Sequence, residues 1–172
     1  SSLAEFYHSF SDARHHLVES RSFDPFVRNV FLFVSRGVFS EGTFVRARSR
    51  AVAQCDDAER LLGVVRDRVG RSVLGKIPRG GIVFGFGAES LLVESLLFSS
   101  KKKHFEVVTC ESRPLLLGRA LSSHLVGASI PVHFFVDGAL LDGLVRSDVV
   151  IVGAHSVGAR HILVPSGALL LA

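Results

Sequence analysis

FEVVTCESRPLLLGRAL, residues 105–121, combines three kinds of segment in a short space. An apolar run is followed by a polar corner at Glu111, Ser112 and Arg113 and then by helix-forming residues. This order predicts a buried strand, a tight connection and a helix with Pro114 at its first position. Open α/β sheets bind ligands beyond the carboxyl ends of their strands, so the corner is a candidate binding site.

The same alternation extends to both sides of this stretch. Short runs rich in Val, Ile and Phe predict buried strands at 82–86, 105–110, 130–137 and 148–154. Helical patterns at 90–100 and 114–128 lie between the first three strands and indicate βαβ units with a parallel sheet. We therefore expect a Rossmann-like α/β domain over residues 79–172. It looks incomplete at its C-terminus, because the final GALLLA would expose apolar side chains.

Residues 1–78 instead show the apolar spacing of α-helices. Apolar residues recur at spacings of three and four from Phe6 onward, which predicts one amphipathic helix. A second helix has Asp24 as its expected N-cap and Gly37 as its stop. A third, over CDDAERLLGVVRDRVGRSVLG at residues 55–75, is expected to end with Gly75 as its C-cap. The fold class predicted is α/β, with a helical N-terminal domain before the sheet.

Positive charge is concentrated in one segment. The chain has 20 Lys and Arg against 16 Asp and Glu, and residues 36–79 hold ten of these cations against five acids. A basic helix can attract acidic or phosphorylated partners, and a solvated helical face gives the same pattern. No aromatic residues are interleaved with Arg46–Arg50, which argues against single-stranded nucleic acid there. The candidate partner-binding basic face consists of Arg46, Arg48, Arg50, Arg66 and Arg71.

Several classes of site find little support in the sequence. The histidines are scattered, so we expect no metal site, and Gly85 and Gly87 lack the third glycine of a dinucleotide loop, so we expect no cofactor. Cys55 and Cys110 form no disulfide framework, which favours a reducing compartment. No apolar run approaches the length of a membrane span.

In a parallel sheet the carboxyl ends of the strands share one edge. Glu111, Ser112, Arg113, Asp137 and His155 would gather there. An arginine beside a helix N-terminus suits an anion, and an Asp and a His could exchange protons with a small substrate. Charged residues are also common wherever a strand meets water, and Glu111 could simply pair with Arg113. Both interpretations remain open at this point.

Several motifs occur in order along the second half of the chain. They are Glu111-Ser112-Arg113-Pro114, Gly118-Arg119, Ile130-Pro131-Val132, Asp137 and Val152-Gly153-Ala154. In these motifs the chain resembles the regulatory subunits (alpha, beta and delta) of eukaryotic translation initiation factor 2B. That family is related to isomerases of methylthioribose 1-phosphate and ribose 1,5-bisphosphate. The resemblance implies an N-terminal helical domain and a Rossmann-like domain that mediates dimerisation between family members.

Departures from the isomerase pattern are as informative as the matches. The catalytic Cys of the isomerases corresponds to Phe86, and their catalytic Asp to His155. Val164-Pro165 replaces a polar Asn-Lys pair, and Glu89 stands where the alpha and beta subunits carry Arg. Glu89 would repel a phosphate. The resemblance therefore implies no catalytic residues and a vestigial ligand or anion site at most.

The resemblance thus implies a non-catalytic regulatory subunit of the factor 2B exchange complex. Its GAH and SRP motifs favour the delta subunit, and the alpha and beta subunits remain alternative assignments. The implied partners are the sibling subunits, bound through the α/β domain in a hetero-oligomer, and initiation factor 2, with RNA as a further candidate. The implied compartment is the cytoplasm, with an organelle as the alternative. Two alternatives are a sugar-phosphate isomerase or sensor of the same fold, and a structural component of a ribonucleoprotein such as a ribosome.

Overall fold

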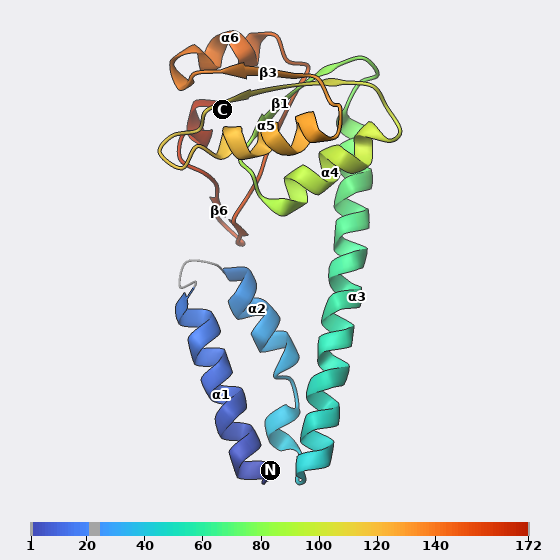
Figure 1. Ribbon diagram of the computed structural model, residues 1–172, viewed down its shortest axis with the longest axis vertical. Helices are drawn as coiled ribbons and strands as arrows, with labels where there is room; N and C mark the ends of the chain where they lie inside the picture. The colour runs from blue at the N-terminus through green and yellow to red at the C-terminus, as the bar shows by residue number, and fades with distance from the viewer. Residues whose placement is uncertain (1, 21–24, 172) are drawn as a thin grey trace. The chain divides into compact units, whose positions relative to one another are not determined.

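The computed structural model describes residues 2–20 and 25–171, and the chain forms two compact units, residues 1–64 and 65–172 (Figure 1). The long helix α3, Phe44–Lys76, contributes to both units. The domain boundary expected after residue 78 stays a prediction. Within the described residues, no helix combines the length and apolar character that crossing a membrane requires.

The first unit is helical, as expected. Its elements are α1 (Leu3–Ser20), α2 (Pro25–Val34), η1 (Val38–Ser40) and the first part of α3. Helix α1 begins with a capping box, because the Ser2 hydroxyl accepts the N–H of Glu5 at 3.1 Å and the Glu5 carboxylate accepts the N–H of Ser2 at 2.8 Å. Asp24, the expected N-cap of α2, lies outside the described residues.

Aromatic side chains fill the space between these helices. Phe10 lies with its ring centroid 5.1 Å from that of Phe31, and the ring of Phe6 meets that of Phe44 edge-on at 5.7 Å. The Tyr7 hydroxyl donates within 2.9 Å of the carbonyl oxygen of Val38, the first residue of η1, and within 2.6 Å of that of Glu41, in the connection between η1 and α3. One hydroxyl therefore anchors that connection to α1.

The second unit is built on a four-stranded parallel sheet, which confirms the predicted α/β class. Its strands are β1 (Ile82–Phe86), β2 (Glu106–Cys110), β3 (Val132–Phe135) and β4 (Val149–Val152). The spatial order is β3-β2-β1-β4, and every pairing is parallel. The chain moves outward from β1 to β3 and then returns to the other side of β1. The topological switch point, where such folds bind ligands, therefore lies between β1 and β4.

Helices cover both faces of this sheet. Helices α4 (Ser90–Ser100) and α5 (Leu117–Gly127) pack on one face around Val83, Leu96 and Leu121, which have no or almost no exposed surface. The other face is covered by η2 (Asp137–Ala139), α6 (Leu140–Val145) and η3 (Ala168–Leu171). A second hydrophobic cluster, which includes Phe84 and Val108, lies on this face. Burial on both faces explains why the central strands, β1 and β2, read as continuous apolar runs.

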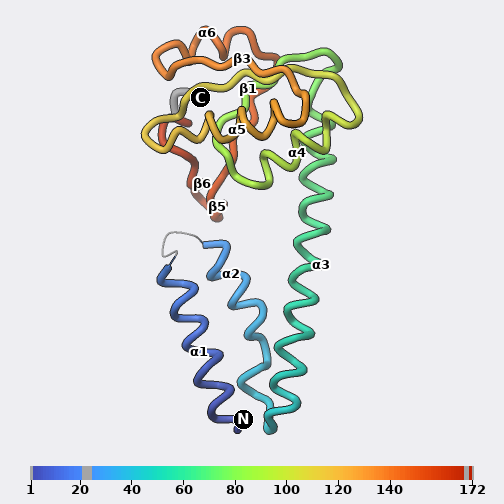
Figure 2. The backbone as a smooth tube through the Cα atoms, viewed as in Figure 1, coloured from blue at the N-terminus to red at the C-terminus, as the bar shows by residue number. Residues whose placement is uncertain are grey.

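Three local predictions differ from the structure. Helix α5 begins at Leu117, and Pro114 belongs to the preceding connection, whose Arg113–Pro114 peptide is cis. Helix α3 continues through Gly75 to Lys76, so Gly75 is no C-cap. A short antiparallel hairpin of β5 (Ser156–Val157) and β6 (Ile162–Leu163) follows β4 and was not expected (Figure 2).

Candidate functional site

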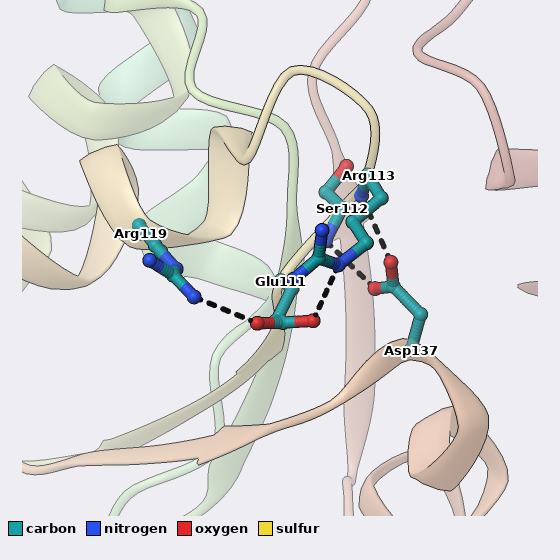
Figure 3. A network of polar contacts seen from close by, with 5 residues as sticks. All are labelled: Glu111, Ser112, Arg113, Arg119 and Asp137. Carbon is teal, nitrogen blue, oxygen red and sulfur yellow. Dashed lines mark hydrogen bonds and ion pairs between the residues drawn. The ribbon is translucent and has the colours of Figure 1, made fainter.

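The polar corner after β2 is held by a carboxylate from the end of the neighbouring strand. Asp137, just after β3, accepts the backbone N–H of Ser112 at 2.7 Å and that of Arg113 at 2.8 Å (Figure 3). Ser112 has φ 59°, a left-handed conformation that is uncommon for any residue except glycine. Two charge-assisted hydrogen bonds therefore stabilise a backbone turn that the local sequence alone would not favour.

A second carboxylate in the corner binds two guanidinium groups. Glu111 accepts Nε–H of Arg113 at one oxygen and Nη2–H of Arg119 at the other, each at 2.9 Å (Figure 3). The Glu111 side chain is 11% exposed, whereas those of Arg113 and Arg119 are 62% and 57% exposed. The arginines thus shield the carboxylate while their outer N–H groups face solvent.

Electrostatics match this geometry. The hydrogen bonds from Arg113 and then from Arg119 lower the pKa of Glu111, and Glu111 in turn raises the pKa of Arg113. Burial works to raise the pKa of Asp137, but the two N–H donors and the Cys110 thiol outweigh it and leave that pKa lowered. Burial, followed by the hydrogen bond and charge of Asp137, raises the pKa of Cys110 to about 11. At neutral pH both carboxylates are ionised and the thiol is protonated.

The start of α5 can approach the corner closely only because of Gly118. A Cβ at this position would overlap the carbonyl oxygen of Cys110. The N–H of Gly118 donates to the carbonyl of Glu111 at 3.1 Å. In the Gly118-Arg119 pair, the glycine therefore allows close backbone packing, and the arginine donates the second guanidinium hydrogen bond to Glu111. Arg119 was not among the predicted site residues, although the G-R pair signalled it.

A different carboxylate fills the switch point between β1 and β4. Glu89 lies where a Cβ on either Gly87 or Gly153 would collide with its Oε2. Both carboxylate oxygens are buried and accept no hydrogen bond from the described residues. Nδ1 of His155 lies 3.4 Å from Oε1, within ion-pair distance but outside hydrogen-bond geometry. The crevice that would receive an anion is therefore occupied by the chain's own negative charge.

The position of a catalytic group in the isomerase pattern holds an apolar side chain. Phe86 ends β1, is 2% exposed and packs in the cluster with Phe84, Val108 and Cys110. Beside it lies a pocket of about 250 Å³, to which both Arg113 and His155 contribute. Its remaining lining consists of Ser112, Pro114, Leu115, Leu117, Val164, Pro165 and Ser166.

Of the predicted site residues, the structure thus brings Glu111, Ser112, Arg113 and Asp137 into one network. His155 shares the pocket with Arg113 but pairs with Glu89. The described residues contain no group of His, Cys, Asp and Glu side chains arranged to hold a metal ion. The corner is arranged to hold a backbone turn and to present two guanidinium groups to solvent.

The predicted basic face on α3 has members in different environments. Arg66 pairs with Glu94 at 3.2 Å and Arg71 with Asp67 at 3.4 Å. The Arg50 guanidinium lies against Gly37, its Nε 3.4 Å from the Arg36 carbonyl oxygen. Arg46 and Arg48 are exposed and have no ion-pair partner among the described residues. Of the predicted basic face, Arg46 and Arg48 are therefore the members in the first unit whose guanidinium groups pair with neither an acid nor a backbone carbonyl oxygen among the described residues.

A parallel sheet of order β3-β2-β1-β4, preceded by a helical unit, defines a Rossmann-type α/β protein whose switch-point crevice is closed by its own side chain. The sequence profile of the Initiation factor 2 subunit family matches residues 2–165. The chain belongs to that family, which confirms the resemblance drawn from its motifs.

Known relatives include both enzymes and translation factors. Ribose 1,5-bisphosphate isomerase of Haloterrigena turkmenica is 26% identical over 144 residues, which cover 83% of this chain and 44% of the isomerase. The fold is similar to that of translation initiation factor eIF-2B from Pyrococcus horikoshii, with a TM-score of 0.74 and 17% identity over 90% of this chain and 54% of that one.

A similar fold is also found in the tetrameric eIF2B-beta2-delta2 complex from C. thermophilum. The TM-score is 0.70 and the identity 20%, with 91% of this chain and 53% of that chain covered. The chain therefore spans about half the length of the relatives it matches.

Proposed function

We propose that this chain is a non-catalytic regulatory and assembly subunit of a factor 2B-type guanine-nucleotide exchange complex. It would bind sibling subunits and initiation factor 2 in the cytoplasm and would not itself perform the exchange step. The observation that carries the proposal is the state of the switch point. Phe86 is buried in the core and the Glu89 carboxylate fills the crevice, so the switch point offers neither the nucleophile of the isomerase pattern nor open space for a sugar phosphate.

Absence of catalysis can be tested with the substrate of a relative. Purified protein would be incubated with ribose 1,5-bisphosphate, with a proven isomerase as the positive control, and the product would be followed by nuclear magnetic resonance. We expect no turnover above the rate without protein. Turnover that an Arg113→Ala variant loses would show that the chain is an enzyme and would contradict the proposal.

Exposed apolar side chains on the α/β unit support assembly with sibling subunits. Edge strand β3 pairs only with β2 among the described strands, and Phe134 on it is 43% exposed. On the adjoining α6, Leu141 and Val145 are 65% and 78% exposed. Changing Leu141 and Val145 together to Glu should reduce co-purification of sibling subunits. Val126→Glu, on α5 and similarly exposed at 61%, is the matched control.

For initiation factor 2 we propose the helical unit, with Arg46 and Arg48 as the free cations that meet an acidic or phosphorylated surface. Reversing both charges to Glu should weaken binding of the phosphorylated factor. A variant with Arg14 and Arg28 reversed changes the net charge equally, on α1 and α2, and should bind normally. Equal weakening by both variants would mean that net charge alone matters.

A second candidate function is sensing of a sugar phosphate without turnover. The pocket that Arg113 and His155 share favours it, as does the similarity to ribose 1,5-bisphosphate isomerase. A rise in melting temperature with ribose phosphates, abolished by Arg113→Ala, would support this alternative. Glu89 argues against it, because its carboxylate would repel a phosphate at the switch point.

A further inference from the structure

The edge of the sheet opposite the candidate site is rich in positive charge. Helix α3 ends at Lys76 just before β1, and helix α4 ends at Ser100 just before β2. Because β1 and β2 are parallel neighbours, the segments 76–79 and 101–104 lie at the same, amino-terminal edge of the sheet. We call their four outward cations, Lys76, Arg79, Lys101 and Lys102, the basic edge.

Hydrogen bonds hold these two segments together. Nζ of Lys103 donates to the carbonyl oxygens of Leu74 and Ile77, each at 2.7 Å, and so caps the end of α3. The N–H of Gly80 donates to the carbonyl of His104 at 2.9 Å. Cations that are about 25 residues apart in the sequence are therefore gathered on one surface by the fold.

The charge of the basic edge is not neutralised within the described residues. All four side chains are exposed, and none has an ion-pair partner there. The carbonyl groups at the C-terminus of α3 already have a cation beside them in Lys103, so the four cations of the basic edge are not needed there. The acids at this edge are engaged elsewhere, since Glu106 pairs with His133 at 2.6 Å and Asp148 accepts the N–H of Ile82 at 2.7 Å.

The composition of this surface fits a polyphosphate better than a protein partner. Protein interfaces centre on apolar or aromatic anchors and are depleted in lysine. The only large apolar side chain in segments 76–79 and 101–104 is Ile77, which is 1% exposed and cannot serve as an anchor. Exposed Lys and Arg without such an anchor are the usual contacts to nucleic-acid phosphates, which carry affinity without sequence preference.

We propose that the basic edge binds the phosphate backbone of RNA without sequence preference. This site lies at the amino-terminal edge of the sheet, opposite the edge that holds the switch point. The proposal is also independent of the regulatory role proposed above, because an enzyme or an assembly subunit could carry the same surface.

The test is fluorescence anisotropy of the whole protein with a labelled double-stranded RNA of mixed sequence, which presents phosphates without unstacked bases, measured at several salt concentrations. With four phosphate contacts, the dissociation constant should rise about 150-fold between roughly 50 and 200 mM salt. The variant R79Q/K101Q/K102Q retains one of the four cations. Its binding should be much weaker and should change only about threefold over the same range.

A matched variant, R14Q/R28Q/R36Q, removes three exposed charges from the first unit and should bind RNA within about twofold of the wild type. Circular dichroism melting would verify that both variants fold. Equal loss of binding in the two variants, or no RNA binding by the wild type at the lowest salt, would overturn the proposal. Equally tight binding of an oligoglutamate peptide of the same charge would also overturn it, in favour of an acidic protein partner.

Discussion

Nδ1 of His155 and Oε1 of Glu89 lie 3.4 Å apart across the switch point between β4 and β1. The Glu89 carboxylate has no hydrogen bond from the described residues and occupies the space above Gly87 and Gly153. In open α/β folds this crevice receives the ligand. Here the carboxylate side chain of Glu89 fills it, beside the imidazole of His155.

Replacing Glu89 by Ser should open the crevice to an anion. The variant loses both the bulk and the charge, so we expect ribose 1,5-bisphosphate to raise its melting temperature while leaving the wild type unchanged. At ligand concentrations ten times the dissociation constant, the stabilisation would be about 1.4 kcal/mol. Glu89→Gln keeps the bulk and should stay unresponsive. An equal shift in wild type and Glu89→Ser would show that Glu89 does not close the site.

Asp137→Asn should loosen the corner. An amide offers one oxygen where the carboxylate offers two, so either Ser112 or Arg113 loses the acceptor for its N–H. We expect the free energy of unfolding to fall by about 1–3 kcal/mol, measured by urea denaturation. Asp142 is exposed on α6 and makes no hydrogen bond or ion pair through its side chain with the described residues, so Asp142→Asn should change the free energy of unfolding by less than about 0.5 kcal/mol. Equal effects of the two substitutions would argue against a special role for Asp137.

Gly118→Ala should be strongly destabilising. The new Cβ would overlap the Cys110 carbonyl, which is backbone and cannot move without shifting β2. The expected loss is about 3 kcal/mol or more. Gly127→Ala, in the same helix with open space around it, should instead add up to about 1 kcal/mol. Thermal melts of the two variants should therefore move in opposite directions, and tolerance of Gly118→Ala would show that the corner can rearrange.

The corner should lose its contribution to stability in acid. The pKa values of Glu111 and Asp137 are lowered in the folded chain. Their contribution is therefore fully present above the unfolded-state values, about 4.3 for Glu and 3.9 for Asp, and is lost as the pH falls through the folded values. The difference in unfolding free energy between wild type and Glu111→Gln should be constant near pH 7 and shrink below about pH 4. A difference that persists to pH 3 would mean that Arg113 and Arg119 do not stabilise the carboxylate.

Continuous apolar strands made the sheet predictable. The strand at 82–86 and the helix at 90–100 have the bounds expected from the sequence. Their signals are local, because each is a run of strand- or helix-forming residues ended by glycine or by lysines. The parallel order followed from the alternation of strands and helices.

The errors came from long-range partners. Helix α5 begins three residues later than expected because the turn is set by Asp137, which lies 25 residues from Ser112. Helix α3 passes through Gly75 because Lys103, more than 25 residues away, supplies its cap. The sequence also gave no sign that Glu89 would fill the space over Gly87 and Gly153, since that depends on how β1 and β4 approach each other.

If this chain works as a regulatory subunit, it should be found in the cell bound to its sibling subunits, and purification from the cell tests this most directly. The tagged protein would be purified from its native cell, and its partners would be identified by mass spectrometry. We predict stoichiometric recovery of sibling factor 2B subunits together with initiation factor 2. Purification of the chain as a homo-oligomer, free of these proteins, would contradict the claim.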